Sequence, residues 1–331
     1  MSKFKSMTRA LGVSLAFVVA SCVVGNPDAS QKVPGNLAER NRTHTDLSYN
    51  PPGHSVATRK LDLYLPAGET PKPVIVWVHG GGWTVGDKTE RDENGVQRGA
   101  LKSILAQVPR GIAVASINYR LSGEATFPAP VQDVKLAVRW LKANAATYKL
   151  DPNKVILAGE SAGGHLAALA AVSQDLFELS VAGWPNSSVA GVVDIVGPTD
   201  LNAFFQHSPY RFYAGHLLGC PVVNGAHQCT QADLQNASVT NYIDHRDPPV
   251  YMAYGDADPV VAHQAQGRLP AEQWALAKGK TLQESEVVLY DLVEGGQHDL
   301  APQSSPDVEE EDRKTYNFAA MQQFLDAVAP R

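Results

Sequence analysis

The chain has 331 residues, of which 44% are hydrophobic and 19% charged, and its formal net charge is −6. This is the composition of an ordinary globular protein, and the length is sufficient for one large α/β domain with a sizeable core. Since no basic patch stands out along the sequence, we expect no nucleic-acid partner.

The first residues have the pattern of an export signal. Three basic residues stand among the first nine, and the apolar run Leu11–Ala20 that follows is too short to span a bilayer. The run leads into Val19-Ala20-Ser21-Cys22, which resembles the bacterial lipobox, where the cysteine is lipidated and becomes the new N-terminus. We therefore predict a lipoprotein-type signal peptide over residues 1–21, lipidation at Cys22 and export to the cell envelope. The alternative is a plain secretory signal on a periplasmic or secreted protein.

Residues 22–41 are rich in Pro, Gly, Asn, Asp and Ser, which predicts a flexible tether. The remaining residues, 42–331, are then expected to form one folded domain. Within it, Cys220 and Cys229 lie close in sequence, and export would place them in an oxidising compartment, where a disulfide is the default. The alternative is a metal pair with His216 and His227, but the spacing matches no common zinc pattern.

Strand and helix patterns alternate along this domain. Strands are predicted over residues 59–66, 73–78, 111–118, 155–158, 189–196, 249–254 and 286–293, with a turn at 151–153. Helices are predicted over residues 129–148 and 314–328. Such alternation is typical of an α/β fold, with a mostly parallel central sheet covered by helices on both faces.

Residues 199–247 interrupt the alternation. They carry the cysteine pair and several aromatic residues, namely Phe204, Phe205, Tyr210, Phe212 and Tyr213. The aromatic content favours an insertion that is packed near a substrate pocket and shapes it. The alternative is an excursion on the surface.

The strand at 155–158 leads into Gly159-Glu160-Ser161-Ala162-Gly163 and then into a run of strong helix formers. Strand, sharp turn and helix, with serine at the turn, is the arrangement of a nucleophile elbow. Small neighbours allow the strained turn that projects the hydroxyl from the sheet. The N–H groups of the following helix point at the reacting centre. Ser161 is therefore the candidate nucleophile.

A serine needs a base to take its proton, and the base needs a carboxylate to hold its tautomer. In an elbow fold these follow the serine in the order acid, then histidine. His298 comes directly after the last predicted strand, whereas His165, in the first turn after the elbow, is expected to pack rather than react.

The acid has two close candidates, Asp256 and Asp258. We predict Asp258, because Pro259 holds it extended and the next two valines can pack the loop down. Asp256 is expected to be a turn residue that bonds its own backbone. Asp299, adjacent to His298, is the third choice.

The tetrahedral intermediate of acyl transfer also needs fixed N–H donors for its oxyanion. His79-Gly80-Gly81-Gly82 is a glycine run immediately after a strand, and glycine lets the backbone approach a substrate oxygen closely. We predict that the donors are the N–H groups of Gly81, Gly82 and Ala162.

With these motifs the chain resembles a serine esterase of the α/β-hydrolase superfamily, and more closely the bifunctional feruloyl and acetyl-xylan esterase-like (BD-FAE) group. The resemblance spans about residues 61–300 and is carried by His79–Trp83, Gly86-Asp87-Lys88, Asn118–Leu121, Arg139–Ala145, Leu150-Asp151-Pro152, Gly159–Leu166 and Asp247–Val250. It implies an α/β-hydrolase catalytic domain over residues 42–331 that needs no metal or cofactor. The family pattern Gly-x-x-Asp also selects Asp258. Glu160 departs from the Gly, Asp or Ser of many relatives.

The expected function is hydrolysis of short-chain or aromatic carboxylic esters by a Ser-Asp-His triad, with acetyl or feruloyl groups on plant polysaccharide as candidate substrates. The expected partners are therefore a small-molecule or polysaccharide ester and, through the N-terminal lipid anchor alone, a membrane. One alternative is an amidase related to kynurenine formamidase. Another is a non-catalytic binding module, although such modules usually lose the serine or the histidine.

Overall fold

The computed structural model describes residues 42–91, 99–300 and 319–330. The predicted signal peptide, the tether and the lipidation site Cys22 lie outside these ranges. Among the described residues, no helix has the length and apolar character needed to cross a membrane.

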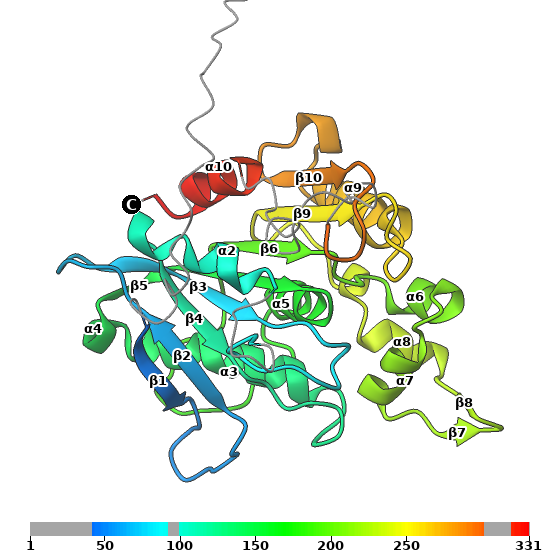
Figure 1. The fold of residues 1–331 in the computed structure, drawn as a ribbon, viewed down its shortest axis with the longest axis horizontal. Helices are drawn as coiled ribbons and strands as arrows, with labels where there is room; N and C mark the ends of the chain where they lie inside the picture. The colour runs from blue at the N-terminus through cyan, green and yellow to red at the C-terminus, as the bar shows by residue number, and fades with distance from the viewer. Residues whose placement is uncertain (1–41, 92–98, 301–318, 331) are drawn as a thin grey trace, which may run out of the picture. The chain divides into compact units, whose positions relative to one another are not determined.

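Within the described residues, one sheet has the strand order β1-β2-β4-β3-β5-β6-β9-β10 (Figure 1). Its strands are β1 Arg42–Ser48, β2 Lys60–Tyr64, β3 Lys72–Val78, β4 Ala113–Ile117, β5 Leu150–Glu160, β6 Gly191–Ile195, β9 Val250–Gly255 and β10 Val288–Val293. β2 pairs antiparallel with both β1 and β4, and the other pairs are parallel. The mostly parallel sheet predicted from the alternation is confirmed.

Helices cover both faces of the sheet. The helices of the described residues are α2 Leu101–Leu105, α3 Ala129–Ala143, α4 Ala145–Tyr148, α5 Ala162–Val172, α6 Leu201–His207, α7 Phe212–Leu218, α8 Gln231–Asn236, α9 Leu269–Ala277 and α10 Ala319–Val328, with short turns of helix at Val108–Arg110, Val239–Asn241, Gln264–Arg268 and Leu282–Glu284. Along β3, Val74, Val76 and Val78 join the core under α3, α5 and α9. Ile75 and Trp77 join the core under α2 and α10. β3 is therefore buried on both faces, as its continuous apolar run predicts.

Three local predictions differ from the structure. The helix expected over 129–148 is divided at Asn144, whose side-chain amide donates to the carbonyl of Trp140. The turn expected at 151–153 lies within β5 as a bulge, because β5 advances from Leu150 to Val155 while β3 advances from Lys72 to Val74. Strand β1 has no counterpart in the prediction, since its sequence is mostly polar.

The insertion 199–247 consists of α6, α7, the hairpin β7 Val222–Val223 and β8 Ala226–His227, and α8. Figure 1 shows these elements together beyond the end of the sheet to which β6 points. A disulfide joins Cys220 to Cys229 across the hairpin, so these cysteines are not metal ligands. The ring of His227 packs against Gly215 of α7, and its Nδ1 lies 3.0 Å from the carbonyl oxygen of Cys220.

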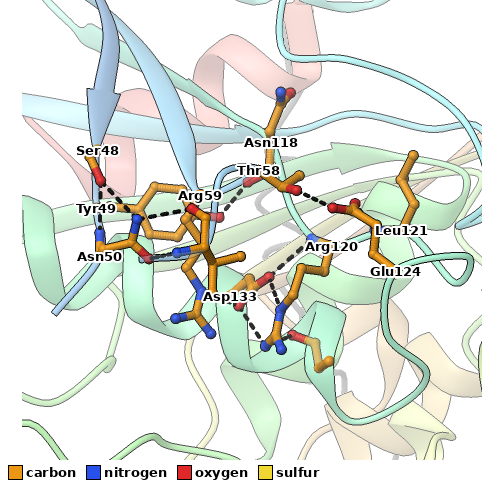
Figure 2. A network of polar contacts seen from close by, with 12 residues as sticks. Ser48, Tyr49, Asn50, Thr58, Arg59, Asn118, Arg120, Leu121, Glu124 and Asp133 are labelled. Atoms are coloured by element: carbon orange, nitrogen blue, oxygen red, sulfur yellow. Dashed lines mark hydrogen bonds and ion pairs between the residues drawn. The ribbon is translucent and has the colours of Figure 1, made fainter. Parts of the chain in front are cut away.

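A buried carboxylate, Asp133 of α3, joins three parts of the chain (Figure 2). It accepts hydrogen bonds from Nε of Arg59 at 2.8 Å, and from the backbone N–H and the guanidinium of Arg120 at 2.8–3.0 Å. Arg59 precedes β2, and Arg120 lies on the loop after β4. Two arginines satisfy one fully buried carboxylate here, which is the arrangement that a buried charge requires.

The loop fixed by Asp133 in turn holds the glycine run after β3. Asn118 accepts a hydrogen bond from the backbone N–H of Lys88 at 2.5 Å and donates to Asp87 at 2.9 Å. The hydroxyl of Tyr119 donates to the carbonyl of His79 at 3.1 Å, and Ser122 donates twice to the carbonyl of Trp83. The β4 loop therefore sets the path of residues 79–88.

Substitution Asp133→Ala should lower the free energy of unfolding by about 3–5 kcal/mol, because it leaves the buried guanidinium of Arg59 and the partly buried one of Arg120 without their carboxylate. Urea denaturation followed by circular dichroism measures this change. The control is Glu69→Ala, which removes an ion pair between two exposed side chains, Glu69 and Lys149, and should cause no measurable change. Equal stability of Asp133→Ala and the wild type would contradict the assigned role.

Candidate active site

The serine of the Gly-x-Ser-x-Gly motif lies on a sharp turn between β5 and α5. Its backbone has φ 54° and ψ −119°, outside the regions that a residue with a side chain normally occupies. Its N–H donates to the carbonyl of Ile195 on β6 at 2.8 Å, and its carbonyl accepts a hydrogen bond from the backbone N–H of His165 on α5. A Cβ atom on Gly163 would lie 2.0 Å from the carbonyl oxygen of Val78, so this position admits glycine alone. The turn thus presents the hydroxyl of Ser161 above the end of the sheet.

The structure brings Ser161, His298 and Asp258 together in one chain of hydrogen bonds. Nε2 of His298 is 2.9 Å from Oγ of Ser161, and Nδ1 is 2.8 Å from Oδ2 of Asp258. Since a carboxylate can only accept, Nδ1 carries the proton and Nε2 is free to accept the proton of the serine. The imidazole therefore has the tautomer that a general base for Ser161 needs.

The loop after β9 holds the carboxylate of Asp258 in place. Its side chain is fully buried, and its Oδ1 accepts hydrogen bonds from the N–H groups of Val260 and Val261 at 2.7 and 3.0 Å. We predicted from the turn pattern that Asp256 bonds its own backbone, and this prediction is wrong. Asp256 accepts instead from the N–H of Gly295 at 2.6 Å, so it ties the β9 loop to the loop that carries His298.

The glycine run lies beside the serine. Gly81 has φ 105°, and a Cβ atom there would lie 2.1 Å from the carbonyl oxygen of Val85. Within the described ranges, the N–H groups of Gly81, Gly82 and Ala162 donate to no other part of the chain. These three N–H groups therefore have no partner among the described residues, which is one requirement for oxyanion donors.

His165 packs between three segments, as expected. It is fully buried, accepts a hydrogen bond from the indole N–H of Trp83 at 3.2 Å, and donates through Nε2 to the carbonyl of Ala237 at 2.7 Å. Burial lowers its pKa to about 4, so it is neutral near pH 7. One imidazole thus links the glycine run, the elbow helix and the end of the insertion.

A cavity of about 310 Å³ opens above the serine. The residues that line it are Gly80, Gly81, Trp83, Glu160, Ser161, Pro198, Phe204, Tyr210, Tyr213, Val260, Val261 and His298. Its wall is mostly apolar or aromatic, and α6, α7 and the turn between them supply Phe204, Tyr213 and Tyr210. The insertion is therefore part of the pocket, and the alternative of a surface excursion does not hold.

A second cavity, of about 430 Å³, adjoins the first through Gly80, Gly81 and Glu160. Its lining includes the ionisable residues His79, Asp87, Glu90 and Arg91. Glu160 accepts a hydrogen bond from the N–H of Ala100 at 3.2 Å. The residue that departs from the family pattern thus lies at the boundary between the two cavities.

Sequence reasoning missed several residues around the site. Asp194 of β6 and Tyr254 of β9 are fully buried beneath the elbow and hydrogen-bonded to each other at 2.8 Å. Ser208, at the end of α6, donates to the carbonyl of Val260 at 2.9 Å and so ties the insertion to the loop of Asp258. An aspartate within the apolar run of β6 could have indicated that Asp194 has a buried partner. The sequence around Ser208 has no comparable feature.

Two features place the chain in the class of α/β-hydrolases. One is the strand order of the sheet, and the other is a serine on a strand-to-helix turn next to a histidine and an aspartate. The family profile that matches is BD-FAE, over residues 61–272. The chain therefore belongs to the BD-FAE family, the group that the sequence motifs resemble.

Relatives and solved structures agree with this assignment. The chain is 30% identical over 239 residues to the esterase LipQ of Mycobacterium tuberculosis, covering 69% of this chain and 52% of LipQ. It is 32% identical over 251 residues to a probable carboxylic ester hydrolase of the same organism, LipM, covering 71% of this chain and 54% of LipM. The chain thus spans about half the length of these curated relatives.

Among solved structures, a truncated carbohydrate esterase from gut microbiota superposes with a TM-score of 0.68 at 26% identity, covering 87% of this chain and 97% of that chain. Esterase B from Lactobacillus rhamnosis superposes with a TM-score of 0.61 at 21% identity, covering 86% and 85% of the two chains. The second likeness shows the α/β-hydrolase fold alone. The fold predicted from the motifs is confirmed.

Asp258→Asn should lower ester turnover by about 10³- to 10⁴-fold, because the amide favours the wrong imidazole tautomer. The matched control is Asp256→Asn, which still offers an oxygen to Gly295 and should lower turnover far less. Steady-state hydrolysis of p-nitrophenyl acetate by the two folded variants compares them. The reverse ranking would transfer the role of the acid to Asp256.

Proposed function

We propose that this protein is a serine esterase that hydrolyses short-chain or aromatic carboxylic esters through an acyl-enzyme. The observation that carries the proposal is the unbroken chain of hydrogen bonds from Ser161 through His298 to the buried Asp258, at 2.9 and 2.8 Å. Among the described residues, no group of His, Cys, Asp and Glu has the arrangement of a metal site, and the proposed chemistry needs none.

In the first half of the reaction, Nε2 of His298 takes the proton of Ser161 as Oγ attacks the ester carbonyl. The resulting imidazolium is stabilised by the carboxylate of Asp258. The tetrahedral oxyanion lies against the N–H groups of Gly81, Gly82 and Ala162. His298 then gives its proton to the leaving alcohol, and an acyl group stays bound to Ser161. In the second half, His298 activates a water that releases the acid.

The shape of the cavity supports small or flat acyl groups. A volume of about 310 Å³ accommodates a short acyl chain or one aromatic ring together with part of the alcohol. Trp83, Phe204 and Tyr213 provide faces on which a ring can stack. Acetyl and feruloyl groups on plant polysaccharide therefore remain our proposed substrates, with the polymer outside the cavity.

The relatives support ester hydrolysis over the alternatives. LipQ is named an esterase and LipM a probable carboxylic ester hydrolase, and one similar solved structure is described as a carbohydrate esterase. An amidase related to kynurenine formamidase could use the same triad. A comparison of p-nitrophenyl acetate with p-nitroacetanilide separates the two, because an amidase would hydrolyse the anilide at a clearly catalysed rate, whereas an esterase would hydrolyse the ester alone.

We also propose that the protein acts at the bacterial cell envelope, attached through a lipid on Cys22. The sequence Val19-Ala20-Ser21-Cys22 supports this location. It is compatible with a polymeric substrate, which stays outside the cell.

Ser161→Ala should lower turnover of p-nitrophenyl acetate by about 10⁴- to 10⁶-fold and leave the fold intact, because only the hydroxyl is lost. The control Ser188→Ala alters an exposed serine and should have no effect. A p-nitrophenyl phosphonate probe should phosphonylate Ser161 with release of p-nitrophenol, so the wild type gains the mass of the phosphonyl group and Ser161→Ala does not. Near-wild-type turnover by Ser161→Ala would contradict the assignment of the nucleophile.

Among p-nitrophenyl esters of rising chain length, kcat/KM should fall steeply beyond about four to six carbons, because the cavity loses complementarity to longer chains. Methyl ferulate should still be hydrolysed, since a flat ring fits between the aromatic walls. The series measures kcat/KM on one enzyme preparation. Faster hydrolysis of long-chain esters would instead indicate a lipase.

A further inference from the structure

The segment that follows β6 makes a tight turn beneath the nucleophile. The carbonyl of Ile195 accepts the N–H of Ser161, and Pro198 lines the cavity. Between them, Val196 has φ 47°, in the left-handed region that a β-branched residue rarely adopts. A turn in this conformation needs strong fixation by its surroundings.

Two buried side chains provide that fixation. Oδ1 of Asp194 accepts a hydrogen bond from the N–H of Gly197 at 3.0 Å, across the turn. The hydroxyl of Tyr254 lies 2.8 Å from Oδ2 of Asp194 and 2.6 Å from the carbonyl oxygen of Gly197. A Cβ atom on Gly164 of α5 would lie 2.3 Å from Oδ1 of Asp194, so the carboxyl group fills the space under the first turn of the elbow helix.

These distances favour two protons in the cluster over one. The hydroxyl of Tyr254 has one proton, but both of its oxygen neighbours are at the distance of a full O–H···O bond. The carbonyl of Gly197 can only accept, so Tyr254 donates to it. One O–H shared between both neighbours would make two bent, weaker bonds, whereas a proton on Asp194 gives the contact with Oδ2 a full hydrogen bond of its own.

We propose that Asp194 is held as a neutral carboxylic acid that donates to Tyr254, and that this acid positions the nucleophile elbow. Asp194 is a positioning residue, because it acts on Ser161 and Pro198 through the turn. Its catalytic consequence rests on the proposed role of Ser161, whereas its protonation state does not.

The surroundings of Asp194 agree with a neutral group. The side chain is fully buried, and within the described ranges it makes no ion pair with a lysine or an arginine. Burial raises its pKa to about 7, although the contacts with the hydroxyl of Tyr254 and the N–H of Gly197 oppose the rise.

The titratable groups that face the pair supply no positive charge near pH 7. His165 on α5 is neutral there, because burial lowers its pKa to about 4. The ring of Tyr290 on β10 stacks on that of Tyr254 at 6.1 Å, and the carboxylate of Asp258 acts on Tyr254 from the loop after β9. Tyr290 is uncharged near pH 7, because burial raises its pKa to about 12, so neither group supplies a positive charge that would stabilise an ionised Asp194.

Stability measurements test the protonation state without reference to activity. In the unfolded chain an aspartate ionises near pH 4, whereas folded Asp194 keeps its proton to about pH 7. Folding therefore binds a proton between these values, and this contribution to stability is lost as pH rises through that window. Asp194→Asn keeps a neutral donor toward Tyr254 and an acceptor toward Gly197, but it cannot titrate.

The experiment is urea unfolding of the wild type and Asp194→Asn from about pH 5 to about pH 8. The unfolding constant of the wild type, relative to the variant, should rise by up to about tenfold per pH unit and become constant above the titration of Asp194. For the control Asp233→Asn the ratio should not change in this range, because the hydrogen bond from Thr230 lowers the pKa of that exposed carboxylate. A ratio for Asp194→Asn that is constant or falls with pH would overturn the proposal.

Two further measurements complete the test. The first works even if Asp194→Asn does not fold, and the second tests the effect of Asp194 on catalysis. The infrared carbonyl band of a protonated carboxyl group should be present at about pH 6 and vanish on alkaline titration. The same band should be present and titrate in Asp247→Asn. This variant removes Asp247, a second carboxyl group whose pKa is raised by burial and which could otherwise account for the band. Absence of this band at about pH 6 overturns the proposal.

On p-nitrophenyl acetate, Asp194→Ala should lower kcat by about 10- to 100-fold through misplacement of the elbow, and Asp194→Asn should restore most of it. A folded Asp194→Asn with the low kcat of Asp194→Ala would show that a neutral donor is not what the elbow needs. Loss of activity in Asp194→Asn with no loss in Ser161→Ala would instead locate the error in the proposed function.

Discussion

The structure depends on one strained residue. Ser161 has φ 54° and ψ −119°, a conformation that side chains disfavour, and it persists because the surrounding backbone leaves no alternative. Gly163 lies so close to the carbonyl of Val78 that even a methyl group would not fit, and the N–H of Ser161 is held by β6. Three adjacent strands, β3, β5 and β6, therefore fix the direction of one hydroxyl group.

Carboxyl groups extend this fixation to the loops, which have no strand partners of their own. Asp133 holds the β4 loop through two arginines, and that loop holds the glycine run. Asp194 holds the turn after β6. Asp256 joins the β9 loop to that of His298. In each case a carboxyl oxygen accepts a backbone N–H of a loop, that of Arg120, Gly197 or Gly295, in place of a strand partner.

The sequence predicted the sheet, the elbow and the positions of Ser161, His298 and Asp258, because each lies at the end of an apolar strand pattern and local chemistry limits the choice. It did not predict β1, whose polar residues lack the alternation of a half-buried strand. It also missed Asp133, Asp194 and Ser208. Their partners are far away along the chain: the bond between Ser208 and Val260, for example, spans 52 residues. Periodicity and motifs report on neighbours, so such pairings need the folded chain.

The insertion shows why pocket shape and catalytic geometry are not independent in this chain. Tyr213 lies against Gly82, where a Cβ atom would come within 2.7 Å of the ring. Ser208 bonds the loop of Asp258, and Ala237 bonds His165 at the start of α5. One segment therefore contacts the proposed oxyanion donors, the acid loop and the elbow helix, while it also supplies the aromatic wall. A change in the insertion that enlarges the pocket must keep these three contacts, since each fixes a different part of the hydrogen-bonded chain around Ser161.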